Sequence, residues 1–133
     1  MKLTTKIILA STLLFVGART ATADQHGNAY VHSRTNGGQV YIMYHNHMSL
    51  YTFDKDEIGK SNCYGGCARK WPPAILAADT PLGENYSLIR RKDGKMQAAF
   101  KGQPLYLWSG DKRVGQTSGD GIGDVWHLAR PEF

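Results

Sequence analysis

The chain has 133 residues and a formal net charge of +5, from 16 basic and 11 acidic residues. Lys2, Lys6 and Arg19 lie within the first 23 residues, so the rest of the chain has 13 basic and 11 acidic residues and a charge of +2. No basic stripe remains there, which excludes nucleic-acid binding as the function. The length of this remainder suits one domain with a single modest core.

The first 23 residues have the layout of a cleavable signal peptide. Lys2 and Lys6 precede the apolar run 7–16, and Ala21-Thr22-Ala23 is a small-x-small cleavage site. The run is shorter than the roughly 20 apolar residues of a membrane-spanning helix. We therefore predict cleavage after Ala23, with Asp24 as the new first residue and a periplasmic or secreted domain without a transmembrane segment. No cysteine near the cleavage point could accept a lipid.

Residues 24–133 contain two copies of one motif. The segment 50–56 (LYTFDKD) returns 55 residues later as 105–111 (LYLWSGD), and the same offset relates Trp71 to Trp126. Upstream of this segment the offset is 56, so one residue has been inserted in the first copy. We place repeat one at about 29–73 and repeat two at about 85–128.

Each copy is predicted to be a three-strand meander followed by a glycine-rich loop that returns to a tryptophan. The expected strands are 30–34, 40–44 and 50–53 in repeat one, and 86–90, 96–100 and 105–108 in repeat two. Turns at Asn36-Gly37-Gly38 and Asp93-Gly94 separate the first two strands of each copy. Helical periodicity is scarce, apart from a short helical turn near 62–70. The fold class is therefore mainly β, a small single domain of two pseudo-symmetric halves that bury Phe53, Trp71, Trp108 and Trp126.

The strongest motif is Tyr-x-aromatic-x-x-Asp, found once in each copy. Its residues are Tyr51, Phe53 and Asp56 in repeat one, and Tyr106, Trp108 and Asp111 in repeat two. Together with Trp71, Trp126 and the cysteine loop, this pattern resembles the bacterial secreted-repeat family described as predicted lipoproteins with a Yx(FWY)xxD motif. The resemblance covers essentially the whole mature chain, and it implies an envelope location, a small repeat domain and no assigned activity.

The chain departs from that family in two ways. Many members carry a lipid-attachment cysteine, and this chain has none. A histidine-rich tip at 43–48 also stands where members usually have a plain turn.

Both copies keep the tyrosine and aspartate of the motif, which favours a structural role over a catalytic one. An aspartate five residues after a strand tyrosine can accept backbone N–H groups of the following loop. We interpret each pair as a latch that holds its loop.

Cys63 and Cys67 are the chain's only cysteines, and they lie in a compartment where disulfides persist. We expect a disulfide that holds the intervening loop and contributes about 2 kcal/mol. Repeat two has Ser118 and Ile122 at these positions, so the repeat fold does not require the bridge. A redox or metal-binding pair is the alternative, although the spacing is not that of thioredoxin and Ala68 excludes covalent c-type haem.

The tip is the most distinctive local feature, with Met43, His45, His47 and Met48 close together. On an extended strand, residues two apart face the same way, so His45 and His47 could bind one ion. Thioethers from Met43 and Met48 would shift the preference to copper, above all Cu(I). His26 and His32 are further ligands only if the fold brings them close.

No nucleophile, base and orienting group can be assembled from the sequence, so no catalytic residue is predicted. The leading interpretation is a non-catalytic periplasmic or secreted module that binds an envelope protein or a small ligand. The alternative is a metal-handling (copper) or redox-associated envelope protein that uses the tip and the cysteine pair.

Overall fold

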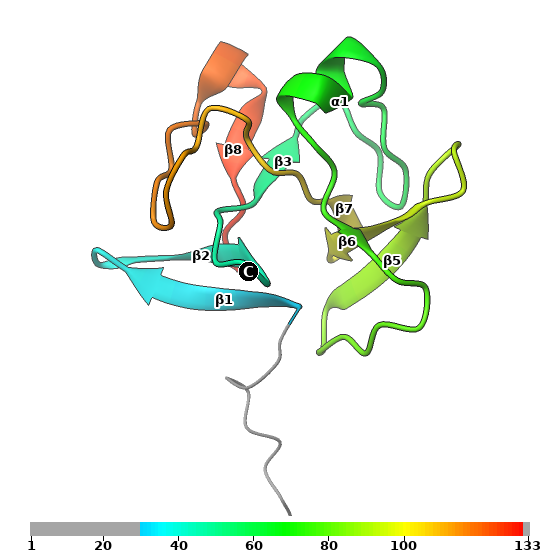
Figure 1. Ribbon diagram of the computed structural model, residues 1–133, viewed down its shortest axis with the longest axis horizontal. Helices are drawn as coiled ribbons and strands as arrows, with labels where there is room; N and C mark the ends of the chain where they lie inside the picture. The colour runs from blue at the N-terminus through cyan, green and yellow to red at the C-terminus, as the bar shows by residue number, and fades with distance from the viewer. Residues whose placement is uncertain (1–29, 132–133) are drawn as a thin grey trace, which may run out of the picture.

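The computed structural model describes residues 30–131 and confirms a mainly β fold (Figure 1). The predicted signal peptide and His26 lie outside the described residues. In chain order the elements are β1 (Val31–Asn36), β2 (Gln39–Tyr44), β3 (Tyr51–Phe53), α1 (Gly66–Lys70), β4 (Ile75–Leu76), β5 (Tyr86–Arg90), β6 (Met96–Phe100), β7 (Gln103–Pro104), a 3-10 helix (Ile122–Asp124) and β8 (Trp126–Leu128). No helix in the described range is long and apolar enough to cross a membrane.

Two antiparallel hairpins, one from each repeat, lie on opposite sides of the molecule (Figure 1). The β1–β2 hairpin turns through Gly37 and Gly38, whose φ angles are 57° and 80°. The β5–β6 hairpin turns near Gly94, with a φ of 83°. These left-handed conformations suit glycine and match the twist of a tight hairpin, which explains why the turn residues located the strands correctly.

The third strand of repeat two is where the prediction is wrong. The expected strand 105–108 is replaced by the two-residue β7, and Tyr106 forms single bridges to Tyr51 and Pro73. Tyr51 and Pro73 occupy both backbone edges of Tyr106, so neither edge is left to extend the β6–β7 pairing. The predicted helical turn near 62–70 is present as α1.

Each half of the molecule is built from both repeats. Strand β3 of repeat one pairs with β8 of repeat two, and β4, which follows repeat one, pairs with β6 of repeat two. The Ala74 N–H donates to the carbonyl of Leu105 at 3.0 Å, and the equivalent Ala129 N–H donates to Leu50 at 2.8 Å. The segment that follows each tryptophan therefore completes the meander of the other copy, about a pseudo-two-fold axis.

The core has two parts, and each draws on both repeats. One part is mainly aliphatic and contains Val31, Ile42, Leu50, Ala74, Leu76, Ala98, Phe100, Leu105 and Ala129. The other, the aromatic cluster, contains Tyr41, Met43, Tyr51, Cys63, Trp71, Tyr106, Trp126 and Leu128. Neither part could form from one repeat alone.

Candidate ligand-binding cleft

The motif tyrosines and aspartates connect the two repeats. The Tyr51 hydroxyl donates to Asp111 Oδ2, and the Tyr106 hydroxyl donates to Asp56 Oδ2, each at 2.6 Å. The two tyrosine backbones also exchange hydrogen bonds, of 2.8 and 2.9 Å. Each carboxylate additionally accepts a backbone N–H from the loop that follows it. Each latch therefore holds its own loop and also binds the opposite repeat.

Burial dominates the electrostatics of these pairs. Burial and the hydrogen bond to Asp111 raise the pKa of Tyr51 above the usual tyrosine range, and burial with the bond to Asp56 does the same for Tyr106. Burial also raises the pKa of Asp56, although the Tyr106 hydroxyl, the Asn62 N–H and the charge of Arg91 oppose this shift. The raised pKa values keep both tyrosines protonated at neutral pH, where they donate these hydrogen bonds.

Four aromatic rings form a continuous stack across the pseudo-two-fold axis. Phe53 stacks on Trp126 at 4.1 Å, Trp126 on Trp71 at 3.9 Å, and Trp71 on Trp108 at 4.2 Å between ring centroids. Trp71 and Trp126 are buried, as expected, whereas Phe53 and Trp108 are half-buried at the two ends. The stack joins the two repeats within the aromatic cluster.

The cysteine loop is fixed against repeat two. Cys63 and Cys67 form a disulfide, so they do not provide a thiolate pair for a metal. The buried Arg91 side chain donates to the Cys63 carbonyl at 2.7 Å and to Ser61 Oγ at 2.9 Å. Its guanidinium also lies 4.2 Å from the centre of the Tyr64 ring. These contacts are sufficient to explain the position of the cysteine loop.

The structure does not bring the four predicted metal ligands together. Strand β2 ends at Tyr44, and His45 and His47 lie in a turn that the His47 N–H closes onto the Tyr44 carbonyl at 2.8 Å. The premise of an extended strand is therefore wrong. Met43 points into the aromatic cluster with 1% of its surface exposed, because alternation along β2 places it there.

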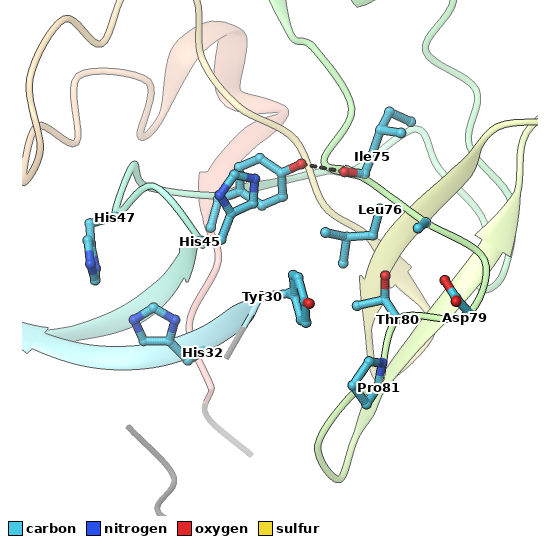
Figure 2. Close-up of a pocket in the computed structure, with 11 residues that line it drawn as sticks. Tyr30, His32, His45, His47, Ile75, Leu76, Asp79, Thr80 and Pro81 are labelled. Atoms are coloured by element: carbon cyan, nitrogen blue, oxygen red, sulfur yellow. Dashed lines mark hydrogen bonds between the residues drawn. The ribbon is translucent and has the colours of Figure 1, made fainter. Parts of the chain in front are cut away.

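The tip instead forms one wall of a cleft of about 730 Å³ (Figure 2). This wall consists of Tyr30, His32, Tyr44, His45 and His47. The opposite wall comes from the segment that leaves repeat one, with Ile75, Leu76, Ala77, Asp79, Thr80 and Pro81. The Tyr44 hydroxyl donates to the Ile75 carbonyl and so ties the walls together. Neither Met43 nor Met48 lines this cleft.

The two ends of the cleft differ in chemistry. At one end the rings of His32 and His47 meet edge to face, with centroids 5.5 Å apart, and Arg34 Nη1 lies 3.4 Å from His47 Nδ1. At the other end lie Asp79 and Thr80, with Tyr30 between the two ends (Figure 2). The volume lies within the range of known small-molecule sites, and the lining mixes ring, apolar and polar groups.

Sequence reasoning missed most of this lining. The register of the first hairpin places His32 directly opposite Met43, so the predicted hairpin already contained the signal that His32 lies beside the tip. Tyr30, Asp79 and Thr80 carry no motif. Only the crossing of the chain from repeat one to β4 brings the second wall to the tip.

The fold defines a class, a small duplicated β domain whose repeats complete one another. The chain belongs to the family described as a secreted repeat of unknown function, whose model matches residues 34–75 and 87–130. The two matched blocks correspond to the two repeats, and the family is the one that the motif resemblance predicted. No curated protein and no solved structure matches the chain.

Proposed function

We propose that the protein is a non-catalytic module of the cell envelope or its surroundings that binds a small ligand in the cleft beside the tip. The observation that carries this proposal is the position of the cleft. Three of its lining side chains come from the inserted tip, at 44–47, where repeat two has Phe100-Lys101-Gly102 instead. We assign the features shared by both copies to the fold, whereas the tip that lines the cleft occurs in repeat one alone.

Native mass spectrometry of the secreted protein, purified from the growth medium under non-denaturing conditions, tests this proposal. Ala77 lines the cleft, and its exposed neighbour Ala78 does not. We expect a small molecule to co-purify with the wild type and with Ala78→Trp, and to be lost or strongly reduced in Ala77→Trp, whose indole would take up part of the cleft.

A wild-type protein that is empty would be incubated with the low-molecular-weight fraction of the same medium and measured again. Retention of no molecule, or equal retention by the two tryptophan variants, contradicts the proposal. Thermal unfolding of both variants controls for damage to the fold.

Metal handling at the envelope is the second candidate function, and one observation favours it. His32 and His47 come from different elements, yet their rings are in contact at the end of the cleft. Imidazole is a common ligand of transition metals.

A further inference from the structure

Three of the four described histidines line a single cleft. His32, His45 and His47 all face it, whereas the fourth, His127, lies elsewhere with its Nε2 atom 2.7 Å from Asp54 Oδ2. This distribution provides a candidate group of ligands and, in His127, a matched histidine outside it.

The turn at the tip holds His47 over His32. His47 has a φ of 64°, a left-handed conformation that is uncommon for a residue other than glycine and costs free energy. The turn is closed by the His47 N–H and by Asn46 Oδ1, which accepts the Met48 N–H at 3.0 Å. Figure 2 shows the two imidazoles side by side, with His45 further along the same wall. The backbone therefore positions this pair.

The ligand chemistry indicates which ion fits. Because both methionines lie away from the cleft, the thioethers that would select Cu(I) are absent from it. Among divalent first-row ions, imidazole sites bind Cu(II) most strongly. Within residues 30–131 no three side chains of histidine, cysteine, aspartate or glutamate converge on a metal position, so a metal site in this cleft would rest on two of these side chains.

We propose that His32 and His47 together bind Cu(II), and that Arg34 opposes this binding. The inference rests on the proposed function in that it uses the same cleft. Arg34 places a guanidinium 3.4 Å from His47 Nδ1, where it occupies the lone pair and adds a positive charge next to the ion. Copper bound through Nδ1 must displace this contact, and copper bound through either ring nitrogen lies near the positive charge of Arg34.

The cleft site is tested by titrating the secreted protein with copper(II) sulfate, by calorimetry and electron paramagnetic resonance, in a His26→Ala background, which removes the histidine outside the described range. We expect one Cu(II) ion to bind, with affinity reduced more than about tenfold in His32→Ala and in His47→Asn. Even the loss of a residue that only hydrogen-bonds a metal ligand lowers metal affinity by about tenfold or more. Asparagine tolerates a positive φ, so His47→Asn keeps the turn. His127→Ala should bind as the background does, and Arg34→Met should bind more tightly.

Unchanged affinity in both ligand variants, or weaker binding by Arg34→Met, overturns the cleft site. Thermal unfolding without metal shows whether any variant has lost its fold, and the spectrum reports the number of nitrogen ligands independently of affinity. If the background protein binds no copper while Ala77→Trp still loses an organic molecule, the copper inference fails and the proposed function stands. If the background protein binds copper but no organic molecule is retained, the organic ligand alone is rejected.

Discussion

The hydrogen bond from the Tyr51 hydroxyl to Asp111 is the sharpest test of how the repeats are joined. Both side chains are buried, with 0% and 7% of their surface exposed, and the oxygens are 2.6 Å apart. Hydrogen bonds to charged groups contribute about 1.5–3 kcal/mol. Asp111 keeps two bonds from Ser118, so we expect Tyr51→Phe to lower the free energy of unfolding by about 2 kcal/mol, with a fall in Tm of roughly 10 °C for a domain of this size.

Urea denaturation of single and double variants measures the contribution of this hydrogen bond to stability and identifies the carboxylate that accepts it. Tyr51→Phe and Asp111→Asn should show a coupling energy of about 1–2 kcal/mol, whereas Tyr51→Phe and Asp56→Asn should be additive within about 0.5 kcal/mol. Tyr86→Phe is the control, since its ring packs on Phe100 and its hydroxyl contacts no carboxylate of the described range. A loss below about 0.5 kcal/mol for Tyr51→Phe, or coupling to Asp56 in place of Asp111, would refute the crossed latch.

Three further outcomes are expected from the same measurements. Replacing Cys63 and Cys67 by serine should lower the free energy of unfolding by about 2 kcal/mol and leave the circular dichroism spectrum β-rich; loss of the folded spectrum would contradict a purely local bridge. Gly119→Ala should cost about 1–3 kcal/mol, because its methyl group would lie within 3.0 Å of three aromatic side chains, and unchanged stability would show that the cluster can yield. The contribution of Tyr51 and Tyr106 to stability should be constant well below pH 10 and fall above it, since both tyrosines ionise in the unfolded chain near pH 10 and their pKa values are raised in the folded one; urea midpoints that do not fall above pH 10 would contradict this.

Spacing alone revealed the duplication, and turn chemistry located the hairpins. Glycines with positive φ and alternating strands are local signals, so Gly37 and Gly94 led to the correct elements. The pairing of β3 with β8 could not be predicted in this way. Because the two copies have the same sequence pattern, a strand could pair with the equivalent segment of either copy. The sequence similarity between the copies does not say which of the two it pairs with.

The tip shows a different limit. Alternation correctly places Met43 on one face of β2, but whether that face is solvent or core depends on the other repeat, whose Tyr106 and Trp126 belong to the same aromatic cluster. The strand also ends one residue before His45 because a turn begins there. Period-two reasoning thus failed just beyond the last residue to which it applies.

The segment after each tryptophan closes the meander of the other repeat. A single repeat would lack the segment that closes its own meander, so two separate copies would have to pair as a two-fold homodimer, each closing the other. The present chain has the arrangement of such a homodimer, with its two repeats joined through residues 77–85. Joining makes the association intramolecular and independent of protein concentration. It also means that the two repeats need not have identical sequences, so one of them can carry a histidine tip and a disulfide while the other keeps a plain turn.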